Sequence, residues 1–180
     1  MAQNGIHNPN SFSSKMQSVG YSVPQPALHS NFVRADFLAC IIARRFSEKL
    51  NQPFFVSVGY FPNYDLRNRD GSLTYEIKLD SLSKLTGRMC FELEYNGEPS
   101  GLTSTKALFW LHVVPISATE LLVHQYLVSS LREAIKGYTL QYGGDYRRSK
   151  FVCIPSVKIQ THEVDRFVIS YELSKLEAYW

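Results

Sequence analysis

The chain has 180 residues, of which 44% are hydrophobic, 13% aromatic and 19% charged, and its formal net charge is +3 at pH 7. This length and composition predict one globular domain with its own core, and they exclude a disordered chain or a small scaffold that folds only with disulfides or metals. A dedicated nucleic-acid-binding protein usually carries a denser positive charge, so the weak charge argues against that class.

The first 29 residues are rich in Asn, Ser, Gln and Pro and contain no Asp or Glu. They offer too little apolar area to offset the ordering cost of roughly 1–2 kcal/mol per residue, which predicts a flexible N-terminal arm before a single α+β domain over residues 30–180. The arm lacks the apolar core of a secretory signal and has no arginine before Arg34. Because the longest apolar run, 107–114, is also too short to span a bilayer, we expect a cytoplasmic protein without a membrane segment.

A helix is predicted to begin near Ser30 or Asn31, because either side chain can cap its first turn. Pro53 is expected to end it. Between these points apolar residues recur at spacings of three and four, as on one face of a helix. They are Phe37, Leu38, Ile41, Ile42 and Phe46.

Two later segments, 73–79 and 89–95, alternate apolar and polar residues with a period of two. This pattern is typical of half-buried strands in an antiparallel sheet. Further strands are predicted at 54–61, 107–114, 151–159 and 167–173. Asp70-Gly71 and Asn96-Gly97 are turn signals between them.

The residues Ser117 to Glu120 have the spacing of a capping box, which predicts a second long helix from Ala118 to about Tyr138. The expected order is therefore α-β-β-β-β-α-β-β, an α+β fold with a largely antiparallel sheet of about six strands and two main helices on one face. Over roughly residues 30–175, this order resembles the fold of type III secretion chaperones. That resemblance implies a compact α+β dimer that holds extended segments of other proteins.

The strand at 107–114 is apolar on both sides, since Phe109 points one way and Trp110 and His112 the other. Two helices cover only one face of a sheet, so either the sheet curls on itself or another molecule covers the second face. We therefore expect a non-enzymatic, adaptor-like or chaperone-like interaction module that binds another protein or itself as a homodimer. The predicted protein-contact residues are Phe109, Trp110, His112 and Phe151, with Arg147 and Arg148 at the rim.

An alternative function comes from residues 138–150, where tyrosines interleave with cations around Gly143-Gly144. Aromatic rings that stack bases, beside cations that neutralise phosphate, are what single-strand-binding proteins use. The same residue types also anchor protein interfaces, and a plain basic loop explains them without any ligand. The candidate nucleic-acid-binding residues are Tyr142, Tyr146, Arg147, Arg148 and Lys150, with Arg44 and Arg45 widening the patch if the first helix lies nearby.

No catalytic, metal or cofactor motif stands out. Cys40, Cys90 and Cys153 are odd in number and far apart, which favours reduced thiols over a disulfide or a zinc site. Glu76, Glu92 and Glu94 are expected on a solvated strand face with cations nearby. An enzyme of unknown reaction is the third hypothesis, and its first sign would be a pocket lined by His112 or His124 and a carboxylate.

Overall fold

The computed structural model describes residues 26–57, 63–143 and 145–170 of the chain. The first helix, α2, spans Pro26–Leu50 and so begins slightly before the predicted start. The predicted arm lies outside the described residues except for 26–29, which belong to α2. Asn51, with a φ of 49°, takes the left-handed conformation after the last turn, and Pro53 follows. This is how helices commonly end.

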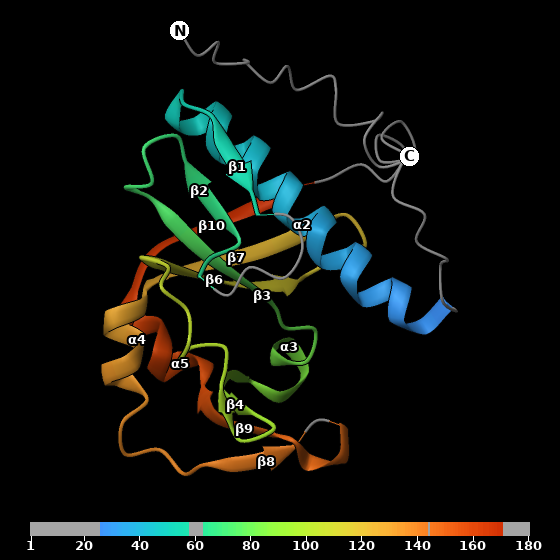
Figure 1. Cartoon of the computed structure of the whole chain (residues 1–180), viewed down its shortest axis with the longest axis vertical. Coiled ribbons are helices and arrows are strands. Elements are labelled where there is room, and N and C mark those ends of the chain that lie inside the picture. Colours follow the sequence, from blue (N-terminus) through green and yellow to red (C-terminus); the bar gives the residue numbers. More distant parts are fainter. Residues whose placement is uncertain (1–25, 58–62, 144, 171–180) are drawn as a thin grey trace, which may run out of the picture.

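A six-stranded sheet forms the middle layer of the molecule (Figure 1). Its strands lie in the order β1-β2-β3-β6-β7-β10, and all neighbours are antiparallel except β3 and β6. Their bounds are β1 Phe54–Val56, β2 Leu66–Asn68, β3 Thr74–Leu79, β6 Phe109–Pro115, β7 Glu120–Leu127 and β10 Glu163–Ser170.

A smaller, four-stranded antiparallel sheet lies against the other side of this layer, in the order β5-β4-β9-β8. Its strands are β4 Arg88–Tyr95, β5 Glu98–Pro99, β8 Gln141–Gly143 and β9 Ser149–Pro155. The short helices are α3 Ser83–Thr86, α4 Val128–Ala134, α5 Ser156–Ile159, η2 Asp145–Arg147 and η3 Gln160–His162. The α+β class and a sheet of about six strands are confirmed, but the predicted strands 89–95 and 151–159 belong to the second sheet as β4 and β9.

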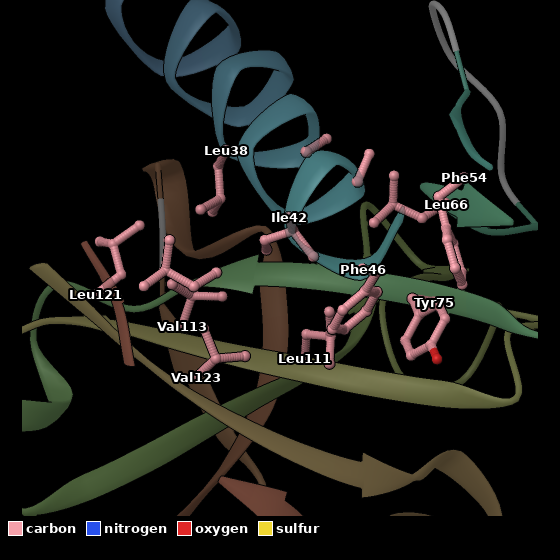
Figure 2. Close-up of a cluster of buried hydrophobic side chains, with 13 residues drawn as sticks. Leu38, Ile42, Phe46, Phe54, Leu66, Tyr75, Leu111, Val113, Leu121 and Val123 are labelled. Atoms are coloured by element: carbon pink, nitrogen blue, oxygen red, sulfur yellow. The ribbon is translucent and has the colours of Figure 1, made fainter. Parts of the chain in front are cut away.

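The first core lies between α2 and the six-stranded sheet. Figure 2 shows Leu38, Ile42 and Phe46 of α2 pointing toward side chains of the sheet. The Phe46 ring centroid is 5.5 Å from that of Phe54 on β1 and 5.7 Å from that of Phe167 on β10. Because one side chain touches strands at both ends of the strand order, the sheet curves around the helix.

The second long helix predicted from Ala118 is wrong, because Glu120–Leu127 forms strand β7 between β6 and β10. Ser117 and Glu120 do interact, with 3.3 Å between Oγ and Oε2, but they do so in the turn between β6 and β7. The Ile116 amide donates to the Glu120 carbonyl there, as in a hairpin. A strand buried on both faces carries the same apolar residues as a buried helix, and only long-range pairing separates the two.

The second face of β6 is covered by this same chain, so the premise of the predicted contact surface is wrong. Trp110 and His112 are fully buried. Trp110 belongs to a second core between the two sheets, while Phe109 packs toward α2 and stacks on Tyr75 at 5.2 Å between centroids. Phe151 lies on β9 of the other sheet, so the four residues form no common surface. The second core comprises Met89, Phe91, Leu102, Ala107, Trp110, Tyr126, Val128, Leu131, Val152, Ile154 and Ile159.

Candidate functional site: a cavity beneath the β3–α3–β4 corner

A cavity of about 380 Å3 lies where the chain turns from β3 through α3 into β4. This volume is within the range of small-ligand pockets. Its walls come from the end of β3, the α3 connection, the outer edge of β4 and two residues of β6. The lining residues that matter most are Lys78, Asp80, Leu82, Arg88, Trp110 and His112.

Asp80 and His112 form a hydrogen-bonded pair in the wall of this cavity, with 3.0 Å between Oδ2 and Nε2. The other carboxylate oxygen of Asp80 accepts from the amides of Leu82 and Ser83, both at 2.9 Å. Burial alone would raise the pKa of Asp80, but these hydrogen bonds and the nearby His112 lower it. The carboxylate is therefore ionised at neutral pH, and it accepts a hydrogen bond from Nε2 of His112.

Two buried nitrogens beside the cavity have no hydrogen-bond partner among the described residues. They are the indole Nε1 of Trp110 and the imidazole Nδ1 of His112. The indole nitrogen is a donor, and the free Nδ1 of a neutral imidazole is an acceptor. Buried polar groups in native proteins nearly always have a partner, so these two nitrogens are exceptions within the second layer of the fold, and neither is open to water.

The entrance carries two cations and three exposed leucines. Lys78 is 3.8 Å from Glu76, and Arg88 makes no ion pair within the described part of the chain. The leucine patch, which we define as Leu79, Leu82 and Leu85, lies on the corner itself. Leu82 is 64% exposed and Leu85 is 83% exposed, so the contact of both side chains with water is energetically unfavourable.

Glu76 lies on the cavity side of β3, directly opposite Trp110 of β6. The solvated-face prediction is wrong for this residue, whose side chain is only 14% exposed and accepts a hydrogen bond from Thr105 at 3.0 Å. Burial, followed by repulsion from Asp65, raises the pKa of Glu76 to about 7. Glu76 is therefore only partly ionised at neutral pH, and it neutralises the positive charge of Lys78 incompletely.

His124 lies beside His112 across β6 and β7, and Arg166 lies opposite His124 on β10. Glu163 contacts the Nδ1 of His124 and accepts two bonds from Arg166, at 2.9 and 2.7 Å. Burial lowers the pKa of His124, and the bond to Glu163 opposes this effect. This group extends the polar row across the sheet, but it does not line the cavity.

The cysteine prediction is wrong for two of the three residues. Cys90 of β4 and Cys153 of β9 are disulfide-bonded across the smaller sheet, whereas Cys40 on α2 is a free, exposed thiol. The two partners are 63 residues apart in sequence, so spacing alone carries no signal of their pairing. The tertiary register of β4 and β9 places them directly opposite each other.

Tyr142, Tyr146, Arg147 and Arg148 lie on the exposed edge formed by β8, η2 and β9, whereas Tyr138 packs against the second core. Tyr146 is 88% exposed and the Arg148 guanidinium carbon is 5.1 Å from its ring centroid. Lys150 Nζ is 5.8 Å from the Tyr142 ring and forms an ion pair with Glu94. Arg147 lies in the same loop and has a positive φ of 56°.

Arg44 and Arg45 do not join this group. They lie on α2, which covers the far side of the six-stranded sheet, while β8 is at the opposite end of the molecule (Figure 1). Arg44 forms an ion pair with Glu48 of the same helix at 3.0 Å.

Sequence reasoning named His112 but missed Asp80, Lys78 and Arg88 as its neighbours. Asp80 is 32 residues from His112, and only the parallel pairing of β3 with β6 brings them together. Lys78 carried a weak signal, because it alternates with apolar residues in a strand and so shares a face with Glu76.

No family model, curated protein or solved structure matches this chain. None of the described helices is long and apolar enough to cross a membrane. Within the described ranges, no three His, Cys, Asp or Glu side chains are grouped so as to share a metal ion.

Proposed function

We propose that the protein is a non-enzymatic protein-interaction module that docks an extended segment of a partner protein on the β3–α3–β4 corner. The observation that supports this proposal is the leucine patch. Leu82 at the N-cap of α3 and Leu85 within α3 are both largely exposed, and burying such a side chain gains about 1.5–3 kcal/mol. Exposed apolar groups that lie together mark interaction sites more often than single ones do.

The outer edge of β4 supplies hydrogen-bonding groups for an extended segment. Cys90 and Cys153 are opposite each other with 4.1 Å between their Cα atoms, as in a non-hydrogen-bonded pair of an antiparallel ladder. The amide and carbonyl of Cys90 therefore point away from β9. On that side, β5 pairs only with Glu94 and Tyr95, and Leu102 bonds only to the Glu92 carbonyl. Adding a strand to such an edge is a common mode of peptide binding.

The charges at the corner favour an acidic partner segment. Arg88 is at the start of β4 with no ion pair among the described residues, and Lys78 faces the same entrance. A segment that alternates leucine with glutamate would place apolar side chains on the leucine patch and carboxylates near these cations. A second copy of this chain is the other occupant that the sequence predicts, and solution mass distinguishes the two.

The test is fluorescence anisotropy with a labelled nine-residue peptide of alternating leucine and glutamate, titrated with the full chain. Leu85→Ser is expected to weaken binding by about tenfold, because about 1.4 kcal/mol of apolar contact is lost. Leu140→Ser is the matched control, since Leu140 is exposed on another part of the molecule. A peptide with lysine in place of glutamate should bind more weakly than the acidic peptide.

Two results would overturn this assignment. If Leu85→Ser and Leu140→Ser bind the acidic peptide equally, the leucine patch is not the docking surface. If the chain is a dimer that Leu85→Ser converts to a monomer, a second copy occupies the corner instead of a partner segment. The disulfide between Cys90 and Cys153 argues against the predicted cytoplasmic location, because stable disulfides are typical of oxidising compartments.

Nucleic-acid binding remains the second candidate, favoured by the exposed tyrosine–cation stacks at Tyr142 and Tyr146. Each stacked base would contribute about 1–3 kcal/mol. Binding of a labelled oligothymidine should then weaken steeply with salt and be lost in the double variant Arg147→Ala with Arg148→Ala. Binding that is unchanged by this double substitution would exclude the loop as the site.

A further inference from the structure

Three strands of the six-stranded sheet end at the edge of the sheet that carries the leucine patch. β3 and β6 pair in parallel, and β7 pairs antiparallel with both β6 and β10, so β3, β6 and β10 run in the same direction. The corner with the leucine patch follows the end of β3 at Leu79, and residues 171–180 follow the end of β10 at Ser170. Both segments therefore leave the sheet at the same edge.

Hydrogen bonds along this edge connect the end of β10 with α3. Ser170 lies opposite Glu120 of β7, and the Glu120 carbonyl accepts from the Ile116 amide at 3.0 Å. The Ile116 carbonyl accepts in turn from Nζ of Lys84 at 2.9 Å, and Lys84 belongs to α3. The turn between β6 and β7 is thus the link between the two segments.

The distance along the edge is short compared with the length of residues 171–180. β10 is three strands away from β3 in the sheet, which is roughly 15 Å at the usual spacing of neighbouring strands. Ten residues span up to about 33 Å when they are extended. The segment that follows Ser170 is therefore long enough to reach Leu82 and Leu85.

The sequence of residues 171–180, which lie outside the described residues, has the chemistry of the partner segment proposed above. It contains Leu173 and Leu176 between Glu172 and Glu177, and its two glutamates outnumber its single lysine.

The cations of the corner complement this segment. Lys84 and Arg88 form no ion pair within the described part of the chain. Residues 1–25, the other terminal segment outside the described ranges, contain no Asp or Glu and offer these cations no negative charge. Charge therefore favours residues 171–180 over residues 1–25 as the occupant.

From these features we propose that residues 171–180 fold back onto the leucine patch of the same chain when no partner segment is bound. The two leucines of the segment contact the leucine patch, and its glutamates lie near Lys84 and Arg88. This inference rests on the proposed function, because it treats the leucine patch as a docking surface. It adds that a partner segment must displace a segment of the chain itself.

The short connection to β10 makes a weak contact sufficient. A segment attached this close to its site has an effective concentration of about 1 mM. An unattached Kd of about 0.25 mM, which the burial of two leucines supports, then covers the leucine patch in about four molecules of five.

The direct test is methyl NMR of the full chain with a neutral, soluble gadolinium chelate, which broadens the resonances of exposed side chains. The methyl groups of Leu82 and Leu85 should broaden about fivefold more in the double variant Leu173→Ser with Leu176→Ser than in the wild type, because the leucine patch is then free in every molecule. The methyl groups of Leu140 are the matched control. Leu140 is exposed on another part of the molecule, so they should broaden equally in both proteins.

A charge variant tests the same contact without removing apolar groups. The double variant Glu172→Lys with Glu177→Lys places cations beside Lys84 and Arg88, and it should increase the broadening of the leucine patch by about threefold. Lys175→Gln is the matched control, because it removes a cation from the same segment. It should not increase the broadening.

Binding of the labelled acidic peptide separates this inference from the proposed function. The double variant Leu173→Ser with Leu176→Ser should bind the peptide about fivefold more tightly than the wild type, because no segment of the chain competes. Equal affinities, with Leu85→Ser still weakening binding, would overturn the inference and leave the proposed function standing. If neither protein binds the peptide but the leucine patch is protected from the chelate in the wild type alone, the inference stands and the partner segment does not.

Two further results would overturn the inference. One is equal broadening of Leu82 and Leu85 in the wild type and in both double variants. The other is protection of the leucine patch that disappears on dilution, because a second copy of the chain would then supply the covering segment. Protection that is unchanged on dilution is the expected result.

Discussion

The raised pKa of Glu76 makes the stability of this protein depend on pH in a way that one substitution removes. Its carboxyl titrates at about 7 in the folded chain, against 4.5 for the ordinary group, because of burial and then the nearby Asp65. The folded state therefore binds more protons than the unfolded state between these two values. Stability from this group is fully present below pH 4.5 and is lost as the pH rises through 7.

The interval from 4.5 to about 7 corresponds to about 3 kcal/mol, at about 1.36 kcal/mol for each pH unit. Solvent screening reduces this little, since the Glu76 side chain is 14% exposed. Glu76→Gln keeps an acceptor for the Thr105 hydroxyl but cannot ionise. Relative to the wild type, this variant should gain about 3 kcal/mol of unfolding free energy between pH 4.5 and pH 8.

The assay is urea unfolding of both proteins at several pH values over this range, with the difference in unfolding free energy plotted against pH. Titrating groups that do not interact with Glu76, His124 among them, cancel in that difference, whereas the repulsion between Glu76 and Asp65 is part of the measured effect. Glu133→Gln is the control, because Glu133 is exposed and pairs only with Lys136, and its difference should stay flat. A difference for Glu76→Gln that varies by less than about 0.5 kcal/mol would refute the reasoning.

Three further outcomes are expected. Cys153→Ser should lower the unfolding free energy by about 4 kcal/mol, since the disulfide closes a loop of 63 residues, and thiol titration of the unreduced wild type should find one free thiol per chain. His124→Gln should flatten the fall in stability below pH 6.5, because the pKa of His124 is lowered by burial and only the unfolded state gains that proton at first. Gly101→Ala should lower the denaturant midpoint of unfolding more than Gly71→Ala does. Both glycines have positive φ, where another residue adds roughly 1–3 kcal/mol of strain. Of the two, only Gly101 would also place the new Cβ 2.6 Å from the Glu92 carbonyl oxygen.

Local sequence patterns correctly predicted the elements whose hydrophobic spacing fits only one kind of secondary structure. The alternation in 73–79 and 89–95 became β3 and β4, and the three-and-four spacing around Ile42 became the buried face of α2. Asn96 and Gly97 form the turn between β4 and β5, both with positive φ. In each case the pattern itself sets which side chains face the core.

Tertiary structure decided what covers the second face of β6 and what forms the cavity. The apolar residues of β7 fit a helix as well as a strand, and their pairing with β6 and β10 decides for the strand. Because this segment is a strand, it does not form the second long helix that was expected to cover the sheet. The four-stranded sheet covers Trp110 instead. Asp80 and His112 are 32 residues apart in sequence, and Cys90 and Cys153 are 63 residues apart. Hydrophobic periodicity carries no information over such separations, because it reports only on residues within a few positions of each other.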